Sequence, residues 1–180
     1  MARIEAYIGI GSNLGDRRDL CARALGLLGL LPHSELTGYS AAYETEPVGD
    51  VGGPFLNLVA RVKTDLTARR LLTILRETER GLGRDHERRS GPRTVDLDLL
   101  FYGDQVIHET DLEVPHPRLH ERRFVLAPLA ELAPDLLHPV LRRTAAALLA
   151  ALRDPHDVRR LGDPIVPWTR DGGRCGLPTA

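Results

Sequence analysis

Apolar and polar positions alternate along this chain with two different periods, which predicts a mixture of strands and helices. Residues 6–10, 35–45, 55–64 and 95–101 each have the composition of a strand, and in the first, third and fourth of them apolar residues alternate with period two, which is typical of strands. In the third of these segments Phe55, Asn57 and Arg61 share one face, and the apolar residues between them share the other. Each of the four segments is therefore expected to be a strand.

Three further segments have apolar residues at the spacing of a helix. The first covers residues 16–31 and ends at Pro32, the second follows the capping residue Thr67, and the last covers residues 140–152. Between residues 114 and 132 the prolines allow only irregular chain and a short helix. The order strand, helix, strand, strand, helix, strand predicts an α+β domain, with a largely antiparallel sheet and helices packed against it.

Length, composition and charge limit the possible functions. The chain has 180 residues, 42% of them hydrophobic, and a formal net charge of -1. These values predict one domain and argue against a nucleic-acid binder or a membrane-surface protein. We assign residues 1–153 to the domain and 154–180 to an extended tail, ordered only if Ile165, Val166 and Trp168 dock. Two distant cysteines and the lack of a long apolar run predict a soluble, cytoplasmic protein without a disulfide or zinc site.

Two aspartates lie within an otherwise apolar strand in the segment GPRTVDLDLLFYGDQVI, which begins at Gly91. Asp96 and Asp98 fall on one face, and an apolar row from Val95 to Phe101 forms the other. Carboxylates this close repel each other unless a cation or an arginine lies between them. The simplest interpretation is a half-exposed strand with a solvated face, and the pair alone does not exclude it.

Arginines are concentrated immediately before this strand. Five lie between Arg80 and Arg93, against Asp85 and Glu87 as the acids of that segment. An arginine-rich loop is usually a solvated surface, but this one leads into two carboxylates that suit magnesium. Together these groups could hold a polyphosphate. No Gly-rich P-loop sequence is present, and the run GIGSN is too short and too common to indicate a nucleotide site.

Four blocks of sequence resemble the 6-hydroxymethyl-7,8-dihydropterin pyrophosphokinase (HPPK) family. They are YIGIGSNL at 7–14, GPRTVDLDLL at 91–100, VPHP at 114–117 and RRFVLAPL at 122–129, in the order of the family. The resemblance implies a ferredoxin-like α+β fold, magnesium, and transfer of a pyrophosphoryl group from ATP to the pterin hydroxymethyl group, with release of AMP, in folate biosynthesis. It implies small-molecule partners only, ATP and a dihydropterin, and a monomer is favoured.

The same resemblance implies roles for individual residues. Asp96 and Asp98 match the magnesium ligands of the family, and Arg84 and Arg93 match its catalytic arginines, which contact the ATP phosphates. The other matching positions line two sites: Glu79, His116 and Arg122 the nucleotide site, and Thr45, Val48, Phe55, Asn57 and Phe124 the pterin pocket, where two rings hold the heterocycle and an amide reads its edge. Without the resemblance, both phenylalanines would be interpreted as core.

The arginine-rich segment also departs from the family pattern. Ser90 stands where relatives often have a bulky residue, and Asp85 or His86 stands where a further basic residue is common. The segment 83–91 has no apolar residue and is expected to be a mobile lid that closes over both substrates. The rival hypotheses are another magnesium-dependent nucleotidyl enzyme on a similar sheet, and a non-catalytic ferredoxin-like binding module.

Overall fold

The computed structural model describes residues 3–46, 52–84 and 94–169. Over these residues the strands are β1 (Ile4–Ser12), β2 (Ser34–Tyr39), β3 (Tyr43–Thr45), β4 (Phe55–Thr64), β5 (Asp96–Tyr102), β6 (Ile107–Glu109), β7 (Leu112–Val114) and β8 (Val158–Arg160). The helices are α1 (Arg17–Gly29), α2 (Ala68–Gly81), the 3-10 turn η1 (Leu119–Glu121), α3 (Arg123–Leu132) and α4 (Ala145–Ala151).

The main sheet is antiparallel at every pairing between its described strands. Its order is β5-β1-β4-β3-β8, with β2 also paired to β4, and β6 and β7 form a separate hairpin. The order β5-β1-β4-β2 belongs to a β-α-β-β-α-β unit of the ferredoxin-like type. The α+β prediction with a largely antiparallel sheet is confirmed.

The predicted strand over 35–45 is wrong as a single element, because it divides into β2 and β3. The division lies at Ser40, whose hydroxyl accepts the N–H of Val59 in β4 at 3.0 Å and donates to the carbonyl of Ala41 at 2.8 Å. A side chain thus takes a place in the ladder that a strand carbonyl would otherwise hold. The strand predicted over 55–64 is confirmed as β4.

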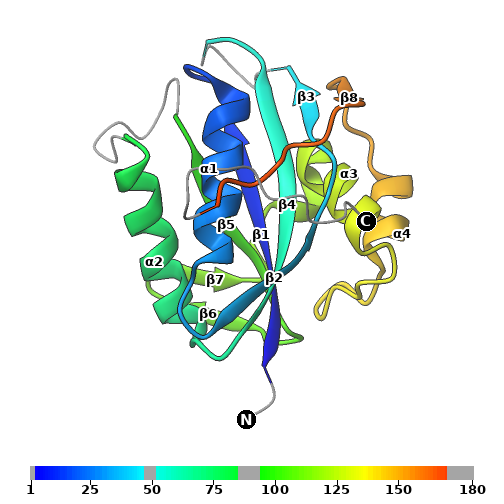
Figure 1. Cartoon of the computed structure of the whole chain (residues 1–180). Helices are drawn as coiled ribbons and strands as arrows, with labels where there is room; N and C mark the ends of the chain where they lie inside the picture. The colour runs from blue at the N-terminus through cyan, green and yellow to red at the C-terminus, as the bar shows by residue number, and fades with distance from the viewer. Residues whose placement is uncertain (1–2, 47–51, 85–93, 170–180) are drawn as a thin grey trace.

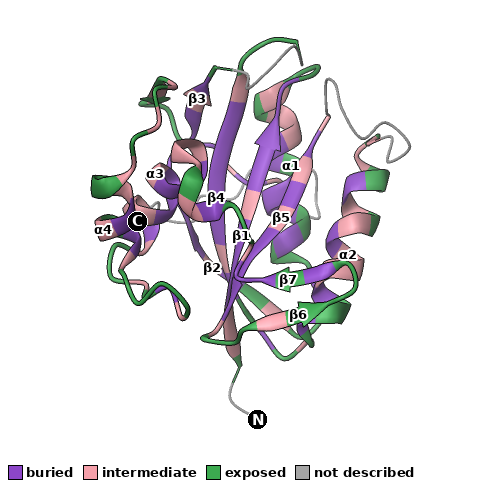
Figure 2. Cartoon of the chain, turned by 180° about the vertical axis from the view of Figure 1, so that it is seen from behind, coloured by how far each residue is buried: buried purple, intermediate pink, exposed green. Residues whose placement is uncertain are grey.

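Helices cover both faces of the sheet. Apolar residues of α1 and α2 pack with Ala6, Ile8 and Ile10 of β1 in the larger core, and α1 lies across this face in Figure 1. On the opposite face, seen in Figure 2, α3 and α4 pack over a smaller core that includes Tyr7 and Val59. No helix in the described part of the chain is long and apolar enough to span a membrane.

A bulge in β5 changes which face Phe101 occupies. Tyr7 of β1 is paired with Phe101 and the next residue, Ile8, with Leu99, so Leu100 is an extra residue on β5. Leu97 and Leu99 remain in the larger core, but Leu100 and Phe101 both join the smaller one. The prediction that Phe101 continues the apolar row is wrong because a bulge interrupts the period of two.

Capping residues fix where the helices begin. The Asp16 side chain accepts the N–H of Asp19 at 3.0 Å at the start of α1, and Thr67 caps α2 as predicted. Thr144 caps α4 in the same way, so the last helix begins at residue 145 and not at 140. Before it lies buried His138, whose Nδ1 accepts the N–H groups of Val140 (3.3 Å) and Leu141 (3.2 Å). Only an unprotonated Nδ1 can accept these two hydrogen bonds.

The segment after α4 returns to the body of the protein. β8 pairs with β3 at the edge of the sheet, and the chain then crosses to α1 (Figure 1). There Ile165 is buried, and Trp168 donates its indole N–H to Asp19 at 3.1 Å and its backbone N–H to the carbonyl of Ala22 at 3.1 Å. Docking of Ile165 and Trp168 therefore orders the described part of this segment.

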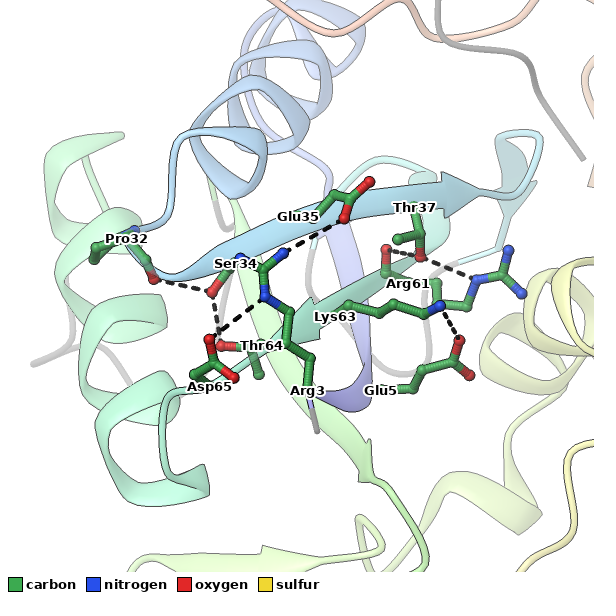
Figure 3. A network of polar contacts seen from close by, with 10 residues as sticks. All are labelled: Arg3, Glu5, Pro32, Ser34, Glu35, Thr37, Arg61, Lys63, Thr64 and Asp65. Carbon is green, nitrogen blue, oxygen red and sulfur yellow. Dashed lines mark hydrogen bonds and ion pairs between the residues drawn. The ribbon is translucent and has the colours of Figure 1, made fainter. Parts of the chain in front are cut away.

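A polar network joins β1, β2 and β4 at the end of the sheet where β1 begins (Figure 3). Arg3 pairs with Glu35 at 3.5 Å and with Asp65 at 3.4 Å, and the hydroxyls of Ser34 and Thr64 lie 2.7 Å apart. Exposed ion pairs of this kind contribute only about 0 to 1 kcal/mol each. The register of the three strands is instead specified by which of their faces is buried, and it determines what lies side by side at the opposite end.

Candidate active site

The candidate site begins as a strip of residues across three neighbouring strands. In β1, Gly11 is paired with Asn57 of β4 on one side and with Asp96 of β5 on the other. Two residues earlier, Gly9 is paired with Asp98 in the same way. Register alone therefore brings the amide and the two carboxylates to one face of the sheet, with glycines between them.

The two glycines leave the floor of this strip without side chains. A Cβ atom at Gly11 would lie 2.9 Å from Oδ1 of Asn57, closer than real Cβ atoms approach, whereas one at Gly9 would lie 3.5 Å from Leu100. The sequence analysis treated GIGSN as uninformative and missed this role. The available signal was that both glycines alternate with buried Ile8 and Ile10, so that they share the face opposite the larger core.

A cavity of about 540 Å³ lies above the Asn57 side of the strip. Phe55, Phe124, Asn57 and Thr45 line it, which brings together four of the five predicted pterin residues. Asn57 donates its Nδ2 hydrogen to Oγ1 of Thr45 at 2.9 Å, and both residues are buried. Both phenylalanines are only half-buried and line the cavity. Val48 lies outside the described residues.

A second cavity, of about 470 Å³, lies beside β5 and the end of α2. Glu79, Arg84 and His116 line it, which brings together three of the predicted nucleotide residues. The structure groups Arg122 instead with the first cavity, where its guanidinium carbon lies 5.7 Å from the ring centroid of Phe124. Arg93 lies outside the described residues.

The aspartates of β5 line both cavities. Asp96 and Asp98 are half-buried and contribute to the walls of the first cavity and of the second. A group held in one cavity and a group held in the other would therefore meet at these carboxylates. Two cavities that share these residues indicate a reaction between two substrates more than the binding of one ligand.

A cluster of three ionisable side chains connects α2 to β5. The Arg84 guanidinium donates hydrogen bonds to the carboxylates of both Glu79 and Asp96. Glu79 is buried, and it also accepts the backbone N–H of Leu97 at 2.7 Å. Every carboxylate in the cluster thus has a charged or polar partner, as buried acids require.

Burial and neighbouring charges alter the acidity of this cluster. Burial raises the pKa of Glu79 to about 7, although the Leu97 N–H and Arg84 oppose the shift. Burial would lower the pKa of Arg84, but the carboxylates of Asp96 and Glu79 outweigh it and the pKa is raised. Arg84 therefore remains a cation that can neutralise negative charge beside Asp96.

His116 is held at the junction of the second cavity with β5. Its backbone N–H donates to the carbonyl of Leu100 at 2.9 Å, and its Nδ1 accepts the N–H of Arg118 at 3.3 Å. Burial, together with the nearby Arg122 cation, lowers the pKa of His116. The ring is thus favoured in its neutral form, which can accept or donate a hydrogen bond in the cavity.

The donor set at Asp96 and Asp98 fits a hard divalent cation. Within residues 3–46, 52–84 and 94–169, no group of three or more His, Cys, Asp or Glu side chains is placed to hold a metal ion. Two carboxylates, however, match what magnesium takes from a protein when waters and phosphate oxygens complete its shell. The residues present fit magnesium bound together with a polyphosphate better than a metal held by protein alone.

Four of the residues that line the first cavity were missed from the sequence. Arg118 precedes η1, and Arg153, Asp154 and His156 belong to the segment that follows α4. Residues 154–180 were assigned to a tail, because prolines and glycines there leave no period that indicates a wall. No local signal in the sequence could have placed them beside Phe124.

The chain is similar to known proteins over most of its length. The profile of the family described as 7,8-dihydro-6-hydroxymethylpterin-pyrophosphokinase (HPPK) matches residues 7–134. A 2-amino-4-hydroxy-6-hydroxymethyldihydropteridine pyrophosphokinase of Bacillus subtilis (strain 168) is 46% identical over 128 residues, which are 71% of this chain and 77% of that protein. A protein of the same name from Methylorubrum extorquens is 41% identical over 157 residues, 87% of this chain and 98% of that protein.

Solved structures agree on the fold. A crystal structure of an HPPK-DHPS in complex with substrates superposes with a TM-score of 0.68 at 14% identity and covers 84% of this chain. This chain spans 45% of the length of that solved chain. At such low identity the likeness supports the fold alone.

Proposed function

Because the chain belongs to the 7,8-dihydro-6-hydroxymethylpterin-pyrophosphokinase family, we propose that it transfers the pyrophosphoryl group of ATP to 6-hydroxymethyl-7,8-dihydropterin in folate biosynthesis. The observation that carries the proposal is the meeting of two cavities at Asp96 and Asp98. The hydroxymethyl oxygen forms a bond to the β-phosphorus of ATP, the bond from that phosphorus to the α,β-bridging oxygen breaks, and AMP leaves with the oxygen. The hydroxyl proton is released.

In this proposal the dihydropterin binds in the first cavity. Its volume of about 540 Å³ is in the range of small-molecule sites. Phe55 and Phe124 would hold the heterocycle between their rings, at about 0.5 to 1.5 kcal/mol per aromatic contact beyond the area buried. Asn57 would read the polar edge of the ring, with its amide oriented by Thr45, and Val48 would supply a backbone contact.

The nucleotide would occupy the second cavity, with its phosphates toward β5. Glu79 and His116 would line its site, and Arg84 and Arg93 would neutralise phosphate charge, which is the main task of a protein in phosphoryl transfer. Holding the hydroxyl in line with the β-phosphorus would supply the rest of the rate acceleration. No side chain is assigned as a general base.

Asp96 and Asp98 would hold magnesium, which when bound would supply positive charge that offsets the negative charge of the phosphates. The ion pair of Arg84 with Asp96 lies beside this cation site. Arg84 donates to Oδ1 of Asp96, so the same carboxylate could contact the arginine and the cation.

The test is a coupled assay of AMP release from ATP, with and without 6-hydroxymethyl-7,8-dihydropterin and with magnesium or a chelator. We expect release only when pterin and magnesium are both present. AMP formation without the pterin would favour another nucleotidyl enzyme, and no AMP under any condition would favour a binding module. A monomer in the cytoplasm remains part of the proposal, which size-exclusion chromatography and cell fractionation would test.

A further inference from the structure

The segment that follows α4 forms one wall of the first cavity. Arg153, Asp154 and His156 line the cavity together with Phe124 of α3. These three residues lie beyond residue 134, where the match to the family profile ends. The family profile therefore gives no information on what this segment contributes, although the alignment with the Methylorubrum extorquens relative, 87% of this chain, extends into it.

Asp154 supplies the cap that α3 lacks. The residue at the N-cap position, Arg122, makes no side-chain capping bond. Instead Oδ2 of Asp154 accepts the N–H of Arg123, the first residue of α3, at 3.0 Å. A carboxylate in this position satisfies an unpaired N–H and complements the positive end of the helix. The first turn of α3 is thus anchored from a segment 31 residues further along the chain.

The helix in turn holds the segment that caps it. The Arg123 guanidinium donates to the carbonyl of Leu152 at 3.1 Å and to that of Asp154 at 3.4 Å, so the segment is held by the helix that it caps. The other carboxylate oxygen, Oδ1 of Asp154, accepts the backbone N–H of His156 at 3.0 Å and contacts Nδ1 of its ring. Because a carboxylate can only accept there, Nδ1 carries the hydrogen and the ring orientation is fixed.

One side chain therefore orients two parts of the cavity wall. The first turn of α3 carries Phe124. Arg122, immediately before the helix, lies over the Phe124 ring. His156 lies on the adjacent wall. The Asp154 side chain is only 9% exposed, so water does not readily replace the hydrogen bonds that it accepts.

We propose that Asp154 is a positioning residue for the dihydropterin pocket, which holds Phe124 through the first turn of α3 and holds the ring of His156 directly. The proposal rests on the proposed function, because it takes the first cavity as the pterin site. Asp154 acts on the pocket walls and not on the second cavity. Its loss is therefore expected to weaken binding of the pterin without changing binding of the nucleotide.

The experiment compares Asp154→Ala, Asp154→Asn and His156→Ala with wild type in steady-state kinetics. Asp154→Ala should raise the KM for the dihydropterin on the order of tenfold, because the pterin would then have to order the first turn of α3 that the cap holds in wild type, with kcat and the KM for ATP close to wild type. Asp154→Asn keeps an acceptor of the same size and should recover part of the loss. His156→Ala should raise the same KM by a smaller factor.

Asp157→Asn is the matched control, because among the residues that the structure describes its exposed carboxylate accepts only the N–H of the next residue, Val158, at 2.9 Å, and it is not among the residues that line the cavity. An unchanged pterin KM in Asp154→Ala would overturn the proposal. A fall in melting temperature together with equal rises in the KM for both substrates would also overturn it, since that result indicates a purely structural role. If the alanine variant does not fold, the KM values of Asp154→Asn provide the same test. Wild type without pterin-dependent AMP release would instead refute the proposed function.

Discussion

A methyl group added at Gly11 should displace the amide that is proposed to read the pterin. In Gly11→Ala the new Cβ would lie 2.9 Å from Oδ1 of Asn57. The strands on both sides fix the backbone of Gly11, so the flexible end of Asn57 has to move. Rotating that amide breaks its hydrogen bond of 2.9 Å to Thr45.

The size of the effect follows from the burial of the two partners. Asn57 is 8% exposed and Thr45 is 3% exposed, so a broken bond leaves polar groups with little access to water. Such a loss costs about 1 to 3 kcal/mol. We therefore expect the dissociation constant of the dihydropterin to rise roughly 5- to 150-fold, while that of a non-hydrolysable ATP analogue changes little.

Isothermal titration calorimetry with each ligand measures this difference, and Gly9→Ala is the comparison. An alanine at Gly9 adds a methyl to the same floor, but it meets Leu100 at 3.5 Å, an ordinary contact distance, and does not touch Asn57. Its effect on pterin binding should be smaller by a clear margin. Equal losses in the two variants would refute the reasoning, because they would trace the effect to the floor and not to the amide.

Three further predictions concern the carboxylates, the aromatic wall and a buried histidine. Asp96→Ala and Asp98→Ala should each abolish magnesium-dependent AMP release yet unfold cooperatively; near-native turnover in either contradicts the metal assignment. Phe124→Ala should weaken dihydropterin binding far more than binding of an ATP analogue, and equal losses with a lower melting temperature would favour a core role. Burial, with His120 nearby, lowers the pKa of His138 in the folded state, so the unfolded state binds the proton more readily and stability should fall as pH drops below about 6.5. Urea unfolding of His138→Asn from pH 7 to 5 should show a flatter dependence, and an equally steep one would contradict this origin.

Much of this site could be predicted from the sequence because strand periodicity is a local property. Alternation in β4 put Phe55 and Asn57 on one face, and alternation in β5 did the same for Asp96 and Asp98. A one-residue bulge was enough to move Phe101 to the other face. The aspartates precede that bulge, so their placement was not affected.

The rest depended on contacts between residues distant in sequence. No local sequence pattern indicates that Gly11 lies between Asn57 and Asp96, because that position follows from the pairing of β1 with both β4 and β5. Nor could a period reveal Asp154, whose role consists of a hydrogen bond to a helix 31 residues away. Single polar contacts leave no repeating pattern, whereas faces of strands do.

The resting arrangement of charges also bears on how the two cavities work together. Arg84 bridges Glu79 and Asp96, and the group is partly withdrawn from water. Uncovering any one charge without a partner would be costly, since buried ions are tolerated only when paired. Under the proposed function the nucleotide brings negative phosphates, and the Arg84 cation would offset part of their charge. The two carboxylates already hold this arginine in place, so less conformational entropy would be lost when it engages phosphate.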